Sequence, residues 1–469
     1  MEFLIDEADG HAYADYSGDR NPLHLDTNYA RKSPFGRPIA HGALVATIAI
    51  NMAMEGRWWS VNKINIQYLK PILYSRTYRI KSSVCGSTVQ IEVCSESSVN
   101  IKISVNDIDD ISMPEKDGIS GDEVGTVQAD LVAFQSLAKK HKLGQHNHKI
   151  YTIAFSSYYV GMIVPGRQAL FSSLSLVFAS GVSFDDDRIQ YSCSYSVARR
   201  FELYRIHAST SVGDQLYIEA FRRPGTIQYP AGSISNLVQH LGRPFAGKKA
   251  IVSGGSRGLG RILAVTMALL GAEVTVLYAN DPTSISDLLL DISGFEVTID
   301  SVRVDLTCQS EVYEFVRKID RCDYLFNIAS PHIESELFKN FRVSDACNFI
   351  DASIRMFSFI TTGLSKKICA DGIVMFASSE FLDTQPKNFS HYIAAKAAIE
   401  SLLSSFPVEL MRDDIHFLAI RFPRILTDQT NGIRDRAAMI SPLTLIPAII
   451  EILITPSAFH NPIRLYGNS

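Results

Sequence analysis

Residues 253–260 read Ser-Gly-Gly-Ser-Arg-Gly-Leu-Gly. A short apolar run, 250–252, precedes them, and a long apolar stretch of helical character follows. Glycines between a strand and a helix let the backbone approach a pyrophosphate, which then lies at the positive end of the helix. A strand before the glycines and a helix after them therefore predict a dinucleotide site.

The alternation of strand and helix continues towards the end of the chain. Short apolar runs alternate with longer helical patterns, and they lie at 274–277, 324–326, 373–376 and 417–420. This alternation is typical of an α/β fold, a doubly wound parallel sheet with helices on both faces.

The glycine spacing resembles that of the short-chain dehydrogenase/reductase family, with Ser253 in place of the usual threonine, and the resemblance covers Lys248–Ser469. It implies a Rossmann fold and hydride transfer with a nicotinamide. It also implies a catalytic Tyr-x-x-x-Lys pair, Tyr392 and Lys396, with the family's serine at Ser379. The residues implied to contact the cofactor are Gly254, Ser256, Arg257, Gly258, Leu259, Gly260, Tyr278, Asp305 and Asn327, together with Tyr392 and Lys396.

Residues four apart share one face of a helix, so Lys396 can stand near the Tyr392 hydroxyl. A nearby ammonium should favour the phenolate and make the tyrosine a proton donor and acceptor near neutral pH. The alternative is an aromatic residue and a cation on an ordinary helix flank. The family's Asn-Asn-Ala-Gly segment appears here with Ile328 and Ser330, and we expect Asp351 at the position of its relay asparagine.

Two further positions bear on cofactor and substrate. Family members that use NAD carry an acidic residue at the end of the second strand, but this chain has Tyr278, followed by Asn280. Arg257 in the glycine loop can pair with a phosphate, so NADPH (NADP+) is the predicted cofactor. Arg424 follows Pro423 where the family usually has glycine, and the segment beyond it is short, so we expect a reduced substrate lid.

The first half of the chain has a different pattern. An apolar helix is expected from about Ile39 to Met54, and strand-like runs follow at 61–68, 77–84 and 89–93. One helix followed by antiparallel strands predicts a helix wrapped by a curved sheet. Because the helix is apolar nearly all round, we expect it to be buried on most faces.

The pattern then recurs. Residues 163–166 precede an apolar run at 169–179, and Tyr204-Arg205-Ile206 matches Tyr78-Arg79-Ile80, at an offset of about 125 residues. An internal duplication is the preferred interpretation, and chance similarity between two amphipathic units is the alternative.

Two segments of the first half resemble the MaoC-like (R)-specific enoyl hydratase family, namely Asp19-Arg20-Asn21-Pro22-Leu23-His24 and Ile39-Ala40-His41-Gly42. The resemblance implies an α+β double hotdog whose second copy has lost the site and only shapes the acyl tunnel. It makes Asp19 and His24 the pair that holds and activates water, and Gly42 the backbone donor to the thioester carbonyl.

The chemistry needs such groups. Adding water to a conjugated thioester requires a base, an acid and a donor for the enolate oxygen. Pro22 restricts the loop between the carboxylate and the imidazole. The alternative is an ordinary turn beside a solvated histidine. For His41 two interpretations stay open, a residue that shapes the pocket and a structural histidine at a helix start.

We therefore predict four segments. They are a hotdog with the hydratase site at 1–115, a degenerate hotdog at 120–225, a Gly- and Pro-rich linker at 226–247 and a short-chain dehydrogenase/reductase domain at 248–469. A length of 469 residues fits several domains.

Composition excludes several classes of function. The net charge of -4 and the absence of basic runs argue against nucleic acid and membrane surfaces as partners. Seven cysteines without Cys-x-x-Cys spacing indicate neither a disulfide framework nor a metal site. The first residues lack secretory features, and prolines interrupt the apolar stretch 437–455, so a cytoplasmic location is expected.

The two resemblances share an intermediate. Reduction of a 3-oxoacyl thioester gives a 3-hydroxyacyl thioester, which a dehydratase consumes, so we predict a bifunctional enzyme of fatty-acyl or polyketide metabolism and expect a homodimer. The acyl carrier, coenzyme A or a carrier protein, stays open. One alternative keeps a single catalytic half beside an acyl-binding or dimerising module, and another is a binding protein without activity.

Overall fold

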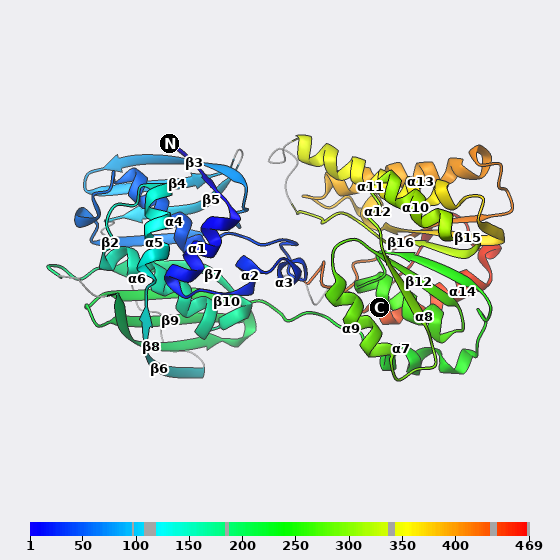
Figure 1. The fold of residues 1–469 in the computed structure, drawn as a ribbon, viewed down its shortest axis with the longest axis horizontal. Coiled ribbons are helices and arrows are strands. Elements are labelled where there is room, and N and C mark those ends of the chain that lie inside the picture. Colours follow the sequence, from blue (N-terminus) through cyan, green and yellow to red (C-terminus); the bar gives the residue numbers. More distant parts are fainter. Residues whose placement is uncertain (96–97, 107–118, 183–186, 336–342, 432–438, 467–469) are drawn as a thin grey trace. The chain divides into compact units, whose positions relative to one another are not determined.

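The computed structural model describes residues 1–95, 98–106, 119–182, 187–335, 343–431 and 439–466. The chain divides into two compact units, Met1–Gly225 and Thr226–Ser469 (Figure 1). The limit predicted for the first hotdog, residue 115, lies outside the described residues.

The first unit is built on one antiparallel sheet in the order β1-β3-β4-β5-β2-β7-β10-β9-β8-β6. Its strands are β1 (Glu2–Ile5), β2 (Lys63–Tyr68), β3 (Arg76–Cys85), β4 (Thr88–Cys94), β5 (Val99–Val105), β6 (Ile119–Gln128), β7 (Ala169–Val177), β8 (Arg188–Ala198), β9 (Leu203–Thr210) and β10 (Gln215–Arg222). The order reads the same way outward from the central β2–β7 pair, through β5, β4, β3 and β1 on one side and β10, β9, β8 and β6 on the other. The sheet therefore has two similar halves.

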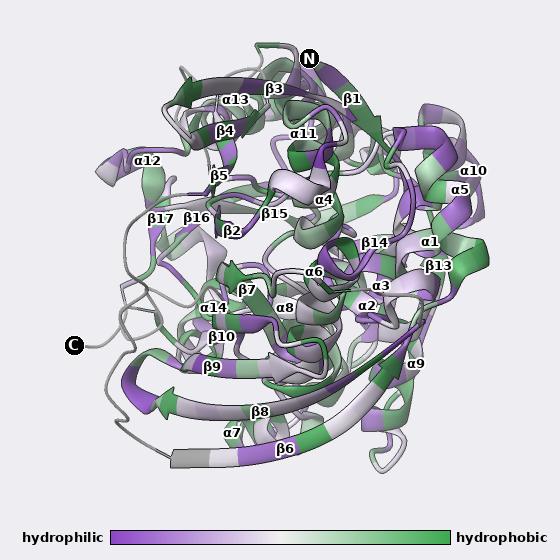
Figure 2. Ribbon diagram, turned by 90° about the vertical axis from the view of Figure 1, so that its left-hand side faces the viewer, coloured by the Kyte–Doolittle hydropathy of each residue, from purple (hydrophilic) through white to green (hydrophobic). Residues whose placement is uncertain are grey.

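The helices of the first unit follow the same division. They are α1 (Glu7–Ser17), α2 (Pro22–Leu25), α3 (Thr27–Arg31) and α4 (Gly42–Ala53) in the first half, and α5 (Leu131–His141) and α6 (His148–Tyr158) in the second. A π-helical turn, Tyr159–Ile163, continues α6. Burial alternates along the first six residues of β8, as expected for a sheet with one covered face, and Figure 2 shows this strand between β9 and β6.

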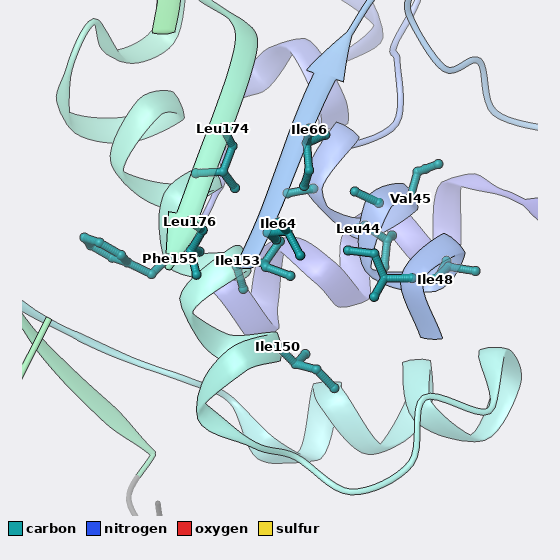
Figure 3. Close-up of a cluster of buried hydrophobic side chains, with 14 of the residues drawn as sticks. Leu44, Val45, Ile48, Ile64, Ile66, Ile150, Ile153, Phe155, Leu174 and Leu176 are labelled. Atoms are coloured by element: carbon teal, nitrogen blue, oxygen red, sulfur yellow. The ribbon is translucent and has the colours of Figure 1, made fainter. Parts of the chain in front are cut away.

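The core of this unit lies between the sheet and two central helices. Residues 43–51 of α4 are all buried, as the apolar sequence predicts for a helix enclosed on most faces. In Figure 3 Leu44 and Ile48 of α4 and Ile150 and Ile153 of α6 belong to one cluster with the residues of β2 and β7, Ile64, Ile66, Leu174 and Leu176. Both halves therefore share one continuous core.

The predicted register of the repeat is wrong. The run 169–179, which was matched to the first helix, forms the strand β7, and the second central helix is α6. Because α4 begins at Gly42 and α6 at His148, the offset is about 106 residues and not about 125. A short apolar run fits a buried strand as well as a buried helix, so periodicity alone could not distinguish them.

The second unit contains a wholly parallel sheet in the order β13-β12-β11-β14-β15-β16-β17. The strands are β11 (Lys249–Ser253), β12 (Glu273–Tyr278), β13 (Ile299–Arg303), β14 (Cys322–Asn327), β15 (Ile368–Ser379), β16 (His416–Phe422) and β17 (Ile463–Arg464). The helices are α7 (Ala231–Val238), α8 (Gly258–Leu269), α9 (Pro282–Ile292), α10 (Gln309–Lys318), α11 (Val343–Leu364), α12 (Phe381–Thr384), α13 (Ser390–Glu409) and α14 (Ile446–Ile454). The predicted parallel α/β sheet is confirmed.

Alternate residues of β11 enter different cores. Ala250 and Val252 pack in one cluster with α8, whereas Ile251 packs in another with residues of α11 and α13. This is the pattern of a central parallel strand that is covered on both faces.

The segment 226–247 is not a free linker. It contains α7, whose Ala231, Ile234 and Val238 are buried in the core of the second unit. The Asp291 carboxylate accepts a hydrogen bond from the Ala231 amide at 2.9 Å. The Gly and Pro residues of this segment indicated a linker, and the amphipathic helix among them was not predicted. No helix among the described residues is long and apolar enough to cross a lipid bilayer.

Candidate active sites

In the first unit, a sharp bend carries Asp19 into the interior. Gly18 ends α1 in the left-handed region, with φ 78°, and its amide bonds the Ala14 carbonyl. Asn21 then caps α2 through the Leu23 amide at 3.0 Å, and Pro22 occupies the first turn of that helix. Asp19 lies between these two helix ends, so its position is fixed from both sides.

The Asp19 carboxylate is only 1% exposed. One oxygen accepts a hydrogen bond from the Ser157 hydroxyl at 2.5 Å, and the other accepts the Asn21 amide at 3.2 Å. Burial raises the pKa of Asp19, and attraction to His24 and the bond from Ser157 oppose that rise. A buried carboxylate with a raised pKa is suited to exchange a proton.

His24 lies within reach of Asp19. Its Nδ1 is 2.8 Å from the Ile39 carbonyl oxygen, which can only accept, so Nδ1 carries the hydrogen and the neutral ring keeps its lone pair on Nε2. Burial lowers the pKa of His24, although Asp19 opposes the shift. Asp19, His24 and His41 each offer one ligand-type atom, and these atoms lie within 4.8 Å of one another. The structure thus brings the predicted pair together.

Gly42 begins α4, with His41 as its N-cap. A Cβ at Gly42 would lie 2.7 Å from the Tyr68 ring, so no side chain fits there. The amides of the first helical turn have no partner within the helix. The Gly42 amide, which is the predicted donor to the thioester carbonyl, therefore lies at the start of a helix and beside the Tyr68 ring.

The second half of this unit contributes directly to the first half's site. Ser157 of α6 donates to Asp19, and the Gly161 carbonyl accepts the Asn21 side-chain amide at 3.2 Å. A Cβ at Gly161 would lie 2.3 Å from an Asp19 oxygen. Sequence reasoning missed both residues because they are about 140 positions from the motif and match no pattern. The second half of the unit therefore supplies residues to the site of the first half.

In the second unit, the glycine loop joins β11 to α8. Gly254 has φ 69°, and a Cβ there would lie 2.9 Å from the Ala329 backbone. A Cβ at Gly260 would lie 2.3 Å from the Gly254 carbonyl oxygen. Arg257 is the N-cap of α8, and its side chain makes no cap hydrogen bond to the first-turn amides, which can therefore bind an anion. Ser256 and Leu259, also predicted to contact the cofactor, are buried beside them, and Gly258 opens the helix.

The other predicted cofactor residues end neighbouring strands at the same edge of the sheet. Tyr278 closes β12, Asn327 closes β14 and Asp305 follows β13. The Asn327 side chain donates to the Thr361 hydroxyl at 3.3 Å, while its buried Oδ1 has no hydrogen-bond partner among the described residues. The carboxyl edge of a parallel sheet is where nucleotides bind, and an unpaired acceptor there fits a ligand's donor.

Ser379, Tyr392 and Lys396 converge at the end of β15 and on α13. Lys396 donates from Nζ to the Ala377 carbonyl at 2.6 Å, and its ammonium lies 5.5 Å from the Tyr392 ring centre. Burial raises the pKa of Tyr392 to about 12, opposed by the Ser379 hydroxyl, and burial lowers the pKa of Lys396 to about 8. Burial is the largest influence on the pKa of Tyr392, and it favours the neutral phenol.

A pocket adjoins these groups. Its lining includes both sides of the predicted site and residues of α11, namely Ser253, Asn327, Ala329, Ser330, Phe349, Ser353, Met356, Phe357, Phe376, Tyr392, Ala395, Lys396 and Ile399. Ser253, at the start of the glycine loop, therefore faces the same cavity as Tyr392 and Lys396.

The prediction for Asp351 is wrong. Its side chain is 59% exposed and pairs with Arg355 at 2.8 Å on the outer face of α11. Ser353 lines the pocket in its place, because two residues further along a helix the side chain points to the opposite side. Thr427 is a residue that sequence reasoning missed. It lies 3.8 Å from the place of a Cβ on Gly258, and only its position after β16 could have indicated it.

These features define two parts. The first is a helix-and-sheet unit with a buried acid–imidazole site, and the second, which follows it in the chain, is an α/β oxidoreductase scaffold. Residues 248–438 match the model of the short chain dehydrogenase family, and residues 2–106 match the model of the MaoC like domain. The chain therefore joins a MaoC-like domain to a short-chain dehydrogenase domain.

Relatives of the second unit are distant. An L-rhamnose 1-dehydrogenase (NADP(+)) of Thermoplasma acidophilum is 27% identical over 198 residues, which is 39% of this chain and 75% of that protein. A fatty acyl-CoA reductase of Acinetobacter baylyi is 23% identical over 39% of this chain and 63% of that protein. A solved short chain dehydrogenase from Burkholderia cenocepacia in complex with NADP has a TM-score of 0.43 and 18% identity, covering 48% of this chain and 98% of its own.

Proposed function

We propose that the chain is a bifunctional acyl-thioester enzyme. The second unit reduces a 3-oxoacyl thioester with NADPH, and the first unit adds water to, or removes it from, the corresponding (R)-3-hydroxyacyl thioester. The observation that carries the proposal is the convergence of Asp19 and His24 in one unit and of Ser379, Tyr392 and Lys396 in the other.

The proposed hydration depends on the protonation states of Asp19 and His24. His24 is neutral, and its Nε2 lone pair accepts one proton of the attacking water as the water oxygen bonds to carbon three. The ionised Asp19 holds that water, and the proton passes from the His24 imidazolium through Asp19 to the carbon next to the carbonyl, so both groups end in the states in which they began. The Gly42 amide donates to the thioester oxygen as negative charge develops on it. Ser157 keeps the Asp19 carboxylate in one rotamer while this happens.

The proposed reduction uses groups that fit a nicotinamide. When bound, the reduced cofactor supplies the hydride. Tyr392, with a pKa of about 12, is protonated at neutral pH and donates its proton to the substrate oxygen. Ser379, which lies in hydrogen-bond contact with Tyr392, orients that oxygen, and the Lys396 ammonium, 5.5 Å from the Tyr392 ring centre, returns a proton to the Tyr392 phenolate. Residues Gly254, Gly258 and Gly260 allow the backbone to approach the phosphates.

The charge at the ribose end supports NADPH. Tyr278 ends β12 where a carboxylate would repel the added phosphate, and Arg257 is exposed at the start of α8. The name of the Thermoplasma relative, an NADP(+) enzyme, agrees with this choice.

The arrangement of the first unit supports a double hotdog as its fold. The two central helices and the mirrored strand order on either side of β2 and β7 are what a duplicated helix-and-sheet unit produces. One site would then be built from both copies, since Ser157 and Gly161 come from the second.

Two assays of the purified full-length chain test the proposal. NADPH consumption with acetoacetyl-coenzyme A tests the reductase, and loss of the conjugated thioester absorbance of crotonyl-coenzyme A tests the hydratase. Acyl-carrier-protein thioesters are assayed in parallel, because the carrier is open. Inactivity on both carriers, beside competent control enzymes, would remove the function assigned to that unit.

Ser157→Ala is expected to lower kcat for hydration about tenfold. The variant removes the donor that favours the ionised Asp19, so the pKa of Asp19 rises further and the acid limb of the pH profile moves to higher pH. Ser156→Ala is the matched control, because the Ser156 hydroxyl bonds the Ile153 carbonyl and not the site. An unchanged acid limb in Ser157→Ala would contradict the assigned contact.

The reductase is expected to lose activity as pH rises through about 8. Burial lowers the pKa of Lys396 to about 8, so the ammonium is present below that pH and is lost above it. This loss is followed as the pH dependence of kcat/KM for the thioester, because that ratio reports the pKa values of the free enzyme. Lys396→Arg, which stays charged, should move the limb upward, and a wild-type profile that is flat to about pH 10 would refute the assignment.

A further inference from the structure

The sequence leaves the role of His41 open, and the structure gives it a definite place. His41 is the N-cap of α4, and its side chain is fully buried. It offers no side-chain cap hydrogen bond to the helix. A buried imidazole at a helix start that does not cap the helix requires another explanation.

His41 contacts both members of the proposed catalytic pair. Its Nε2 lies 3.0 Å from the Asp19 backbone carbonyl oxygen and 3.9 Å from the Asp19 carboxylate. Its ring stacks on the ring of His24, with centres 3.9 Å apart and planes inclined by 32°. The Tyr13 ring packs 4.9 Å away.

The acceptors determine which nitrogen of each ring carries hydrogen. A carbonyl oxygen only accepts, so His41 carries hydrogen on Nε2, and His24 carries it on Nδ1 towards Ile39. The two imidazoles thus have opposite tautomers. Nε2 of His24 is free to take a proton, whereas Nε2 of His41 is committed to the backbone of Asp19.

We propose that His41 is a positioning residue of the hydratase site, a permanently neutral imidazole that fixes the Asp19 backbone through Nε2–H and holds the His24 ring by stacking. This inference rests on the proposed function of the first unit. His41 exchanges no proton in the reaction, and it sets the distance between the two groups that do.

The groups that face His41 favour the neutral form of its ring. Burial, His24 and His11 lower the pKa of His41, and the bond to the Asp19 backbone opposes them. Protonation of both stacked imidazoles would place two positive charges in contact, so the charge that His24 takes up during turnover favours a neutral His41.

Two variants separate the hydrogen bond from the stack. His41→Gln keeps an N–H donor at a similar reach and loses the ring, whereas His41→Phe keeps a ring and loses the donor. We expect His41→Phe to lower kcat for crotonyl-coenzyme A about a hundredfold with KM changed less than about twofold, and His41→Gln to retain activity within about tenfold. His148→Gln, a buried histidine in the first turn of α6, is the matched control. Full activity in His41→Phe, or an equal loss in His148→Gln, would overturn the proposal.

A measurement without substrate separates this inference from the proposed function. Nitrogen-15 spectra of the histidine rings in the full-length protein should show one ring, absent in His41→Phe, that stays neutral with hydrogen on Nε2 from about pH 5 to pH 8. Titration of that ring, or hydrogen on its Nδ1, would overturn the inference whatever the activity. If the ring behaves as expected and the wild type hydrates no thioester, the proposed function fails and the positioning contact stands.

Discussion

Replacing Asp19 by Asn is expected to lower kcat for hydration of crotonyl-coenzyme A by about 10³ or more. The side chains have the same shape, so the amide oxygen can still accept from Ser157 while the group loses its charge and its capacity to exchange a proton. NADPH-dependent reduction in the second unit should change less than about twofold, since Asp19 belongs to the first unit.

The control for this prediction is Asp15→Asn. Asp15 lies four residues earlier, is exposed and pairs with Arg20 on the surface. Its loss removes a charge from the same region without touching the buried pair, so hydration should persist within about twofold. Retention of hydration in Asp19→Asn would show that the carboxylate is not part of the chemistry.

Replacing Tyr392 by Phe is expected to lower kcat for reduction of acetoacetyl-coenzyme A by about 10³. The variant removes only the hydroxyl, which with its pKa of about 12 is protonated at neutral pH and is the proposed proton donor. The ring contacts with Phe349 and Phe381 remain possible, so the pocket should keep its shape. Hydration in the first unit should be unaffected.

NADPH binding supplies the control. Tyr392→Phe should bind NADPH within about threefold of the wild type by fluorescence titration, because the phosphate and ribose ends of the cofactor meet other residues. Tyr313→Phe, on the exposed face of α10, should leave both binding and turnover unchanged. Reduction at the wild-type rate in Tyr392→Phe would exclude the tyrosine as the donor.

Local motifs predicted the elements that carry the chemistry. The glycine loop, the tyrosine–lysine spacing and the apolar helix each contain their physical reason within a few residues, and the structure places them as strand, turn and helix. The positions of Asp19 and His24 could be predicted for the same reason, because Gly18 and Pro22 determine locally how the loop bends.

Long-range relations could not be predicted in the same way. Ser157 meets Asp19 only because the second half of the sheet continues the first, and no pattern near Ser157 marks that contact. Asp351 was placed by counting residues from Ser379, but a count does not give the phase of a helix, and Ser353 faces the pocket. The predicted register of the repeat was wrong because the sequence of β7 is as apolar as that of a buried helix.

The most direct test of the two-site account uses NADPH deuterated at the transferred position, together with a 3-oxoacyl thioester and the full-length protein. Reduction places deuterium on carbon three, and subsequent loss of water leaves it there. We predict that mass spectrometry will find deuterium in both the 3-hydroxyacyl and the enoyl thioester, with Asp19→Asn yielding only the former and Tyr392→Phe neither. A wild-type reaction that produces deuterated 3-hydroxyacyl thioester and no enoyl thioester, or no labelled product at all, would contradict the account.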